Sequence, residues 1–558
     1  MDPIDWLIVL GLNGAVILYG FHLARGTKTS REWFLGSRAL PWWAIGLSMF
    51  ATNMDNSDLV SVTGYTYQWG LAILTVHTLG SALGGLLVAF FVVPTFYRAG
   101  LYTNAEYLES RFGPSMRLLS ALIQIQYRTT VLGLMIWALF LLLTNLVHMT
   151  PVAAWTLIVL LVVLSASYTA WGGLRTVVIT DALQSIILLI GVFVLFTVVS
   201  RAAGGWSGTL ETLAELSAEA EPVAGQIRAV DGPHIGRFHG KDGQTSPYMV
   251  VLGWIIVACG YWTVNHTQTM RLMGARSLWD ARMGALLGVA LSMPIAYACC
   301  TLGVFGRALF PEFESADEMF PHLAATYLGP GLKGLVVAGV LAAGLSTFDS
   351  MGSALSAVFT RDVYARLIAP DRDDEHYVKV GRYATVAILS LGFAYIPFIR
   401  SKATMLEAFR TLIPVFVTPL FTTYLIGIWT RFPRRAGIGG LALGGLYGIV
   451  AFYDRETQDL PWLPNWFTGS AEAFSWSIVW TLLGATAVTL LGADRKSADQ
   501  TAAPGSPTNR GWLARSSEEL PPIREHPFRT APPLWLHPAG FALALILASA
   551  YIIFVVFW

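Results

Sequence analysis

The chain has 558 residues, of which 54% are hydrophobic and only 13% are charged. Soluble domains carry about 25% charged residues, so the composition excludes a set of soluble domains and predicts a polytopic membrane protein. The 36 basic and 35 acidic residues nearly cancel, which excludes a nucleic-acid binder with a broad positive field. The three cysteines lie inside apolar runs and predict neither a disulfide framework nor a zinc site.

Long apolar runs follow one another along the whole chain. A membrane span needs about 20 mostly apolar residues, and by this criterion the chain has about fourteen spans. One span precedes ten core helices, and three more close the chain. The predicted bounds are 4–24 for the first span; 41–66, 69–97, 117–147, 151–170, 177–200, 247–272, 282–309, 332–360, 377–399 and 404–430 for the core helices; and 436–454, 473–492 and 538–557 for the last three.

Basic residues gather in alternate loops between these spans. Lysine and arginine are enriched in the cytoplasmic loops of membrane proteins, so these loops are predicted to be cytoplasmic. An even number of spans then places both termini outside the cell membrane. The basic residues are Arg25, Lys28, Arg31 and Arg38; Arg98 and Arg111; Arg175; Arg271, Arg276 and Arg282; Arg361, Arg366 and Lys379; and Arg431, Arg434 and Arg435.

Two polar segments are too long to be ordinary connections between spans. The second of them is rich in Pro, Ser and Thr, which is typical of a flexible tether. Neither segment is large or apolar enough to be a catalytic domain. The chain is therefore divided into a transmembrane body at 1–492 with core repeats at about 41–200 and 247–430, an extracellular loop at 201–246, a flexible cytoplasmic loop at 493–536 and a final span at 537–558.

Polar residues interrupt two of the predicted core helices. The first contains Asp55, Asn56, Ser57 and Asp58 in mid-span, and the sixth contains the polar run 260–268. Irregular backbone at membrane depth normally lines a cavity inside the protein, because every backbone polar group in lipid needs a partner. The two helices are five core helices apart and so cross in opposite directions, which predicts a transporter site at the midplane. The alternative is that these polar residues merely pack between helices.

The eighth core helix carries oxygen-bearing groups that suit a sodium ion. Ser346 and Thr347 are adjacent hydroxyls, and Ala343 lies one turn earlier with a carbonyl that a hydroxyl can free from the helical ladder. Asp349 and Ser350 share the face of Ser346. The alternative is that the hydroxyls only bond back to the i−4 carbonyls, which does not explain a carboxylate in lipid.

A second carboxylate, Asp181, lies on the fifth core helix near Gln184. Two buried carboxylates without a cation repel each other, so either they share an ion or one is protonated. If the two carboxylates share an ion, the sequence predicts a second sodium site, built from Asp181, Ser346, Asp349 and Ser350.

A series of short motifs has a specific order and spacing: 34–43 leading into 51–54, 99–113, 172–181 followed by Gln184, then Tyr261, Trp262, Asn265 and Arg271, and 343–347 through 360–364. Together they make the chain resemble the sodium:solute symporter family, which includes sodium–glucose cotransporters and bacterial proline and sialic acid permeases. The resemblance runs from about residue 5 to about residue 455.

The resemblance implies an all-α fold of two inverted five-helix repeats, as in the leucine-transporter class, with extra helices at both ends. It also implies a sodium ion between the first and eighth core helices. In some members the residue that matches Asp181 lies on the sodium exit route or in a second sodium site. The ligands that carry over to the main site are the carbonyls of Ala51, Met54 and Ala343 and the hydroxyls of Ser346 and Thr347.

The same resemblance implies a substrate pocket between the first, second, sixth and tenth core helices. Tyr261 matches the aromatic that caps the substrate from the cytoplasmic side, and Asn53 matches the asparagine that steadies this aromatic. The pocket departs from the sugar-transporting pattern, because glutamines of that pattern are replaced by Asp58 and, in a loose alignment, by Arg410. These two residues either bind the solute with both signs of charge or simply pair with each other.

Two further positions fall where sugar transporters place polar ligands on the second helix, namely His77 and Thr78. A lone histidine is also a common packing residue, so His77 has both interpretations. Arg128 on the third helix is deep enough in the membrane to be costly unless it is paired.

These observations predict a sodium-coupled symporter that imports a small polar solute, sugar-like or a carboxylate or amino acid, by alternating access. The alternative is a transporter-like membrane sensor that binds solute without coupled transport. No metalloprotease or nucleophile-elbow motif is present, so an enzyme is not expected. The expected partners are the solute, sodium and the lipid bilayer, with no nucleic acid and no obligate protein partner.

Overall fold

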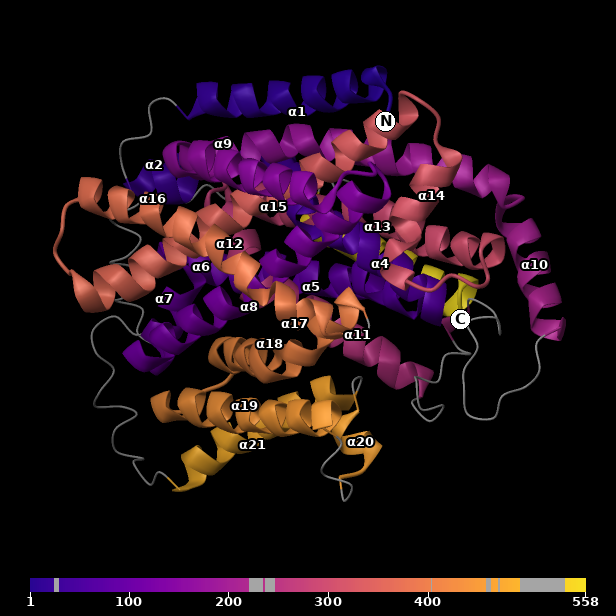
Figure 1. Cartoon of the computed structure of the whole chain (residues 1–558). Coiled ribbons are helices and arrows are strands. Elements are labelled where there is room, and N and C mark those ends of the chain that lie inside the picture. The colour runs from indigo at the N-terminus through magenta and orange to yellow at the C-terminus, as the bar shows by residue number, and fades with distance from the viewer. Residues whose placement is uncertain are drawn as a thin grey trace.

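The computed structural model describes residues 1–24, 30–219, 234–235, 246–402, 404–457, 463–469, 472–491 and 537–558. Within these ranges the chain forms helices and no strand, and its one isolated bridge joins Leu40 and Ala275. Figure 1 shows the helices packed together, with α1 along one side and α19 and α21 on the opposite side. Twelve described helices are long and apolar enough to cross a membrane, as expected of a multi-pass membrane protein.

The bounds of the helices in the first half of the chain largely agree with the predicted spans. They are α1 (Pro3–Leu23), α2 (Ser30–Leu35), α3 (Trp42–Asn53), α4 (Asn56–Trp69), a second span of α5 (Ser81–Leu87) and α6 (Val93–Ala99) with shorter turns at Leu71–Ile73, Val76–Gly80 and Val88–Val92, then α7 (Asn104–Phe112), α8 (Pro114–Asn145), α9 (Pro151–Ala202) and α10 (Gly205–Glu219).

The second half has the same general pattern of long spans and short connecting helices. Its helices are α11 (Pro247–Val264), α12 (His266–Met273), α13 (Leu278–Leu309), α14 (Met319–Tyr327), α15 (Leu332–Val358) continued by Phe359–Ile368, α16 (Asp374–Leu391), α17 (Ile396–Arg400), α18 (Met405–Trp429), α19 (Arg434–Thr457), α20 (Asn465–Thr468), α21 (Glu472–Leu491) and α24 (Pro538–Tyr551) continued by Ile552–Val556. The predicted flexible loop 493–536 lies outside the described residues, as does most of the loop 201–246 after α10.

The structure confirms both predicted helix interruptions. The first core span is divided into α3 and α4 at Met54 and Asp55, and the sixth is divided into α11 and α12 at Asn265. Each second half begins with a side chain that accepts a backbone N–H: Asp55 from Ser57 and Asp58, and Asn265 from Thr267. Such caps supply partners for backbone groups that a break in a membrane helix would otherwise leave unpaired.

Helix α9 merges two spans that the sequence predicts as separate helices. Its 52 residues form two helices that meet at Gly173, and each of the two is long enough for one bilayer crossing. The helix bends at Gly173, where φ is 64° and ψ is −167°. A Cβ at Gly173 would lie 2.8 Å from the backbone of Trp33, so only glycine allows both this conformation and this approach.

The expected count of about fourteen spans therefore differs from the twelve long helices for two reasons. The pair α3 and α4 is counted as no single long helix because each half is short, and α9 is counted once although it is long enough to cross twice. The broken span packs against several long helices, because α3 contacts α13, α9 and α15.

The first helix is fixed to α15 by a buried carboxylate. Asp5 is 1% exposed, and its Oδ1 accepts the backbone N–H groups of Gly331 at 2.7 Å and Gly334 at 2.8 Å. A Cβ at Gly334 would lie 2.5 Å from Asp5 Cα, so the two helices touch at this point. Asp5 of α1 thus supplies partners for two N–H groups at the N-terminus of α15.

We predict that Asp5→Ala will destabilise the protein by about 1–2 kcal/mol, because it leaves the first turn of α15 without its acceptor. The thermal unfolding temperature of the purified protein should fall. Asp5→Asn is the matched control, since its amide oxygen can still accept, and it should retain most of the stability. Equal unfolding temperatures for wild type and Asp5→Ala would contradict this function of α1.

Candidate functional site

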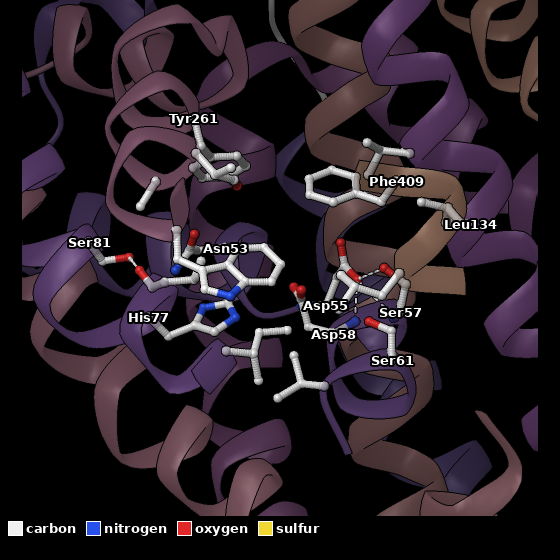
Figure 2. A pocket seen from close by; sticks show the side chains of 18 of the residues that line it. Asn53, Asp55, Ser57, Asp58, Ser61, His77, Ser81, Leu134, Tyr261 and Phe409 are labelled. Carbon is white, nitrogen blue, oxygen red and sulfur yellow. Dashed lines mark hydrogen bonds between the residues drawn. The ribbon is translucent and has the colours of Figure 1, made fainter. Parts of the chain in front are cut away.

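A cavity lies beside the break between α3 and α4, with walls from α4, the second span, α8, α11 and α18 (Figure 2). It has about 800 Å³ of empty space, counting its open side. The polar lining residues are Thr52, Asn53, Asp55, Ser57, Asp58, Ser61, His77, Ser81, Arg128 and Tyr261; the apolar and indole side chains are Val62, Ile73, Val76, Val131, Leu134, Trp254, Val257, Ala258, Trp262, Met405, Leu406 and Phe409.

The two acidic lining residues form the capping box of α4. Asp55 Oδ1 accepts the backbone N–H of Ser57 at 2.8 Å, the Ser57 hydroxyl at 2.5 Å and the N–H of Asp58 at 3.2 Å. Asp58 Oδ2 accepts the backbone N–H of Asp55 at 3.2 Å. The helix interruption therefore fixes both carboxylates at the cavity wall.

Tyr261 is held in a way that differs from the expectation. Its hydroxyl donates to the carbonyl oxygen of Thr52 at 3.1 Å and accepts from Gln268 Nε2 at 2.9 Å. Asn53, which was expected to steady it, donates its amide N–H to Ser292 Oγ at 2.8 Å instead. Tyr261 thus joins the two helix interruptions directly, because Thr52 lies at the end of α3 and Gln268 at the start of α12.

Four of the six predicted substrate residues line the cavity, and two do not. Asn53, Asp58, His77 and Tyr261 belong to its wall, and Figure 2 shows Asp58 and His77 on opposite sides of the space below Tyr261.

Thr78 and Arg410 are not among the lining residues. The hydroxyl of Thr78 is buried and donates to the carbonyl oxygen of Leu74 at 2.7 Å. The guanidinium carbon of Arg410 lies 4.9 Å from the centre of the Trp254 ring. Asp58 takes part in none of the ion pairs found among the described residues, so a direct Asp58–Arg410 pair is not present.

The cavity also contains residues that the sequence did not assign to the pocket. Arg128 of α8 lines it, although the sequence marked this residue only as a costly buried charge. Trp254 stands one turn before Ala258 on α11, and no spacing argument distinguished it from the other tryptophans. A basic residue in the middle of an apolar span was the signal for Arg128.

The predicted main sodium ligands lie where α3 ends against α15. Ser346 Oγ donates to the carbonyl oxygen of Ala51 at 3.1 Å, and Thr347 Oγ1 donates to that of Ala343 at 3.3 Å. Both hydroxyls are fully buried. Helix α3 ends at Asn53 and Met54 has φ −120° and ψ 87°, so its carbonyl is outside the regular helical ladder. These are neutral oxygens from two helices, a donor set that suits a weakly held hard cation.

The carboxylate of Asp181 has a partner that the sequence argument did not provide. Asp181 Oδ2 lies 2.8 Å from Arg271 Nη2 in a fully buried ion pair, and it also accepts from the hydroxyls of Ser48 at 2.6 Å and Ser350 at 3.2 Å. Arg271 additionally donates to Thr52 Oγ1 at 2.8 Å. The premise that both buried acids lack a cation is therefore wrong for Asp181.

Asp349 is turned toward α9 and is surrounded by hydroxyl groups. It accepts from Ser165 Oγ at 2.5 Å, from Thr169 Oγ1 at 3.0 Å and from Tyr168 Oη. Among the described residues no hydrogen bond joins Asp349 to Asp181, Ser346 or Ser350. Of the four predicted ligands of the second site, only Asp181 and Ser350 are hydrogen-bonded to each other.

A buried acid from a loop outside the spans contacts the backbone of the cavity residue Met405. Asp317 lies in the turn Ala316–Glu318, and its Oδ2 accepts the backbone N–H of Met405 at 2.7 Å, at the start of α18. Burial, and to a smaller extent the neighbouring Glu318, raises the pKa of Asp317 to about 7. A Cβ at Gly64 of α4 would lie 2.7 Å from the carbonyl oxygen of Ala316, so this turn joins α4 to α18.

We predict that Asp317→Asn will remove a pH-dependent loss of stability. The raised pKa of Asp317 means that the folded protein holds this proton more tightly than the unfolded chain does. The stability gained in this way is complete below pH about 4, which is the pKa of an aspartate in the unfolded chain, and it is lost as the pH rises to about 7. The unfolding temperature of wild type should fall relative to the variant between pH 5 and pH 8. Glu312→Gln, which changes an exposed acid on the same loop, is the control; parallel pH profiles for wild type and Asp317→Asn would rule the effect out.

Comparisons with known proteins agree with this architecture. A model of the sodium:solute symporter family matches residues 33–444. The sodium/myo-inositol cotransporter 2 of Rattus norvegicus is 26% identical over 479 residues, which covers 81% of this chain and 70% of the relative. The sodium/glucose cotransporter of Vibrio parahaemolyticus is 25% identical over 474 residues, 78% of this chain and 82% of the relative.

Two solved structures share the fold. The substrate-bound, outward-open state of a Na⁺-coupled sialic acid symporter superposes with a TM-score of 0.72 at 20% identity, over 88% of this chain and 98% of the other. Mhp1, a nucleobase-cation-symport-1 family transporter, superposes with a TM-score of 0.54 at 12% identity, over 87% and 98% of the two chains. These similarities confirm the expected all-α, inverted-repeat fold of the leucine-transporter class.

Proposed function

The chain belongs to the sodium:solute symporter family, and we propose that it imports a small polar organic solute together with sodium by alternating access. The observation that carries this proposal is the contact between the broken span and α15, where Ser346 meets the carbonyl of Ala51 beside the polar cavity. Family membership and the transporter relatives favour transport over catalysis, so the protein is proposed not to be an enzyme.

The proposed orientation places the basic loops in the cytoplasm and both termini outside the cell membrane. In this orientation Tyr261 is proposed to close the cavity on its cytoplasmic side. Its hydroxyl holds it there by bonding to Thr52 and Gln268. Relatives named for glucose and myo-inositol support a sugar-like solute. The acids Asp55 and Asp58 with Arg128 support a solute with charged groups as well.

Coupling is proposed to act through the last turn of α3. Sodium would be held by the carbonyls of Ala51, Met54 and Ala343 and the hydroxyls of Ser346 and Thr347, and it supplies a positive charge between α3 and α15. Met54 directly precedes Asp55, the cap of α4. An ion at this position therefore favours one geometry of the interruption, and the same interruption fixes the acids of the cavity.

We predict that Ser346→Ala will raise the sodium concentration needed for half-maximal uptake by about tenfold, which corresponds to the loss of one ligand worth about 1.4 kcal/mol. Uptake should be measured in proteoliposomes with an imposed sodium gradient. Ser356→Ala is the matched control, because Ser356 is equally buried on the same helix and donates only to the Ser353 carbonyl. Solute movement that is equally fast without sodium would show that the coupling ion is wrong.

The same assay separates the transporter from the sensor alternative. A transporter accumulates solute against its gradient when sodium is present. A sensor binds solute and is stabilised by it, but it does not move it. Solute-dependent stabilisation without sodium-driven accumulation would therefore favour the sensor.

A second sodium site is also proposed, from Asp181, Ser346, Asp349 and Ser350. The contacts of Arg271 with Asp181 and Ser350 mean that an ion could enter only if the guanidinium moves away. Asp349, which has hydroxyl donors but no cationic partner among the described residues, then supplies the remaining negative charge.

We predict that Asp349→Asn will lower the number of sodium ions moved per solute from two to one, because the amide keeps the shape but removes the charge that a second ion requires. The ratio follows from parallel flux measurements of labelled sodium and labelled solute. Ser165→Ala, which removes one donor to Asp349 and no charge, is the control and should leave the ratio unchanged. A ratio of one in wild type that persists in Asp349→Asn would count against the second site.

A further inference from the structure

Arg128 provides a positive charge inside the cavity and makes no direct ion pair with a described residue. It is 2% exposed, and its guanidinium carbon lies 5.6 Å from the ring centre of Tyr261 and 5.8 Å from that of Tyr127. Its Nε has no hydrogen-bond partner, and Arg128 takes part in none of the ion pairs found among the described residues. A buried guanidinium that no carboxylate contacts is costly, so this site is suited to a ligand that supplies one.

The opposite charge lies on α4, where one carboxylate oxygen has no hydrogen-bond partner among the described residues. The capping box occupies Asp55 Oδ1 and Asp58 Oδ2, while Asp58 Oδ1 makes no hydrogen bond with a described residue. Figure 2 shows the Asp58 carboxylate directed into the space between α4 and His77. The cavity therefore presents a cation on α8 and a carboxylate on α4, and no ion pair joins them within the described residues.

The net charge of the filled site favours a solute that is neutral overall. Asp58 and Arg128, when ionised, present equal and opposite charges to the open space of the cavity. A solute with a net charge would leave an uncompensated charge in a low-dielectric cavity. A solute with one group of each sign keeps the balance and gives each buried charge a partner.

We propose that the solute is a zwitterion of the amino-acid type, with its carboxylate on Arg128 and its ammonium group on Asp58. This inference rests on the proposed function, because it uses the same cavity. The planar guanidinium suits a carboxylate, with which it forms paired hydrogen bonds. The side chain of the solute then faces the apolar part of the wall, which includes Val131, Leu134 and Phe409.

A neutral polyol matches this wall less well. Its hydroxyls point in all directions, and those that face Val131, Leu134 and Phe409 would lose water without gaining a partner. It would also offer only neutral groups to Arg128 and Asp58, and hydrogen bonds between two charged groups are stronger. Arg410 cannot substitute for Arg128 here, because it stacks on Trp254 and does not line the cavity.

The test begins with the wild-type protein and needs no variant. The purified full-length chain, in sodium buffer, is screened by thermal shift against the common amino acids, glucose and myo-inositol. The amino acid with the largest shift is then compared with its amide, which lacks the carboxylate charge, and with its des-amino acid, which lacks the ammonium group. Each analogue should bind at least about tenfold more weakly, because each leaves one buried charge unpaired.

Three arginine variants then locate the anion-binding group. Arg128→Gln should weaken binding of the amino acid by tenfold to a hundredfold and bring its affinity close to that of the amide, and Arg128→Lys should recover part of the loss because it keeps the charge. Arg307→Gln is the matched control: this arginine also stacks on a tyrosine ring, at 5.4 Å from Tyr67, but lies off the cavity. It should bind as wild type does.

Several outcomes would overturn the proposal. They are a shift with glucose or myo-inositol and none with any amino acid, an amide that binds as tightly as the amino acid, or a loss of affinity in Arg410→Gln but not in Arg128→Gln. Sodium-driven uptake of a polyol would refute the zwitterion and leave the proposed function intact. Amino-acid binding with the predicted dependence on Arg128, but without sodium-driven uptake, would refute the transport function and leave the zwitterion site intact.

Discussion

A helix that is interrupted inside a bilayer must find partners for the backbone groups it releases, and this requirement organises the centre of the protein. At the first interruption Asp55 accepts two backbone N–H groups and one hydroxyl, and Asp58 returns a bond to the Asp55 N–H. At the second, Asn265 has the same function for α12. At the first interruption the capping residues Asp55 and Asp58 also line the cavity, so the requirement for satisfied backbone and the polar cavity wall have the same cause there.

The second organising feature is the buried ion pair between Asp181 and Arg271. A guanidinium at this depth is tolerated because it also donates to Ser48 and Thr52 of α3 and to Ser350 of α15. The pair therefore joins four helices, α3, α9, α12 and α15, and it adds no net charge. Buried ion pairs contribute little to net stability, and the hydrogen bonds of Arg271 here form together only when α3 and α15 lie as they do in this structure.

Sequence reasoning was reliable where one residue sufficed to carry the argument. Asp55 and the polar run 260–268 in apolar spans located both interruptions, and the family resemblance paired Ser346 with Ala51, whose carbonyl Ser346 contacts. It failed where the outcome depended on which of several neighbours a flexible side chain reaches. Arg271 was recognised as a motif residue, yet its pairing with Asp181 requires the packing of α12 against α9 and α15, which no spacing reveals. Arg410 was assigned to the pocket by a loose alignment and Arg128 was noted only as a costly buried charge, and only the rotation of α8 and α18 decides which one faces the cavity.

The bond from Tyr261 to Thr52 has a consequence for the order of events in transport. Ala51 and Thr52 are adjacent in the last turn of α3; the carbonyl of the first is the proposed sodium ligand, and that of the second holds the tyrosine beside the solute cavity. A change at either carbonyl moves the other, because they belong to consecutive peptide units that are joined at the Thr52 Cα. Thermodynamic linkage then applies in both directions: whatever sodium adds to the affinity for the solute, the solute must add equally to the affinity for sodium. Departure of either ligand to the cytoplasm would thus weaken the hold on the one that remains.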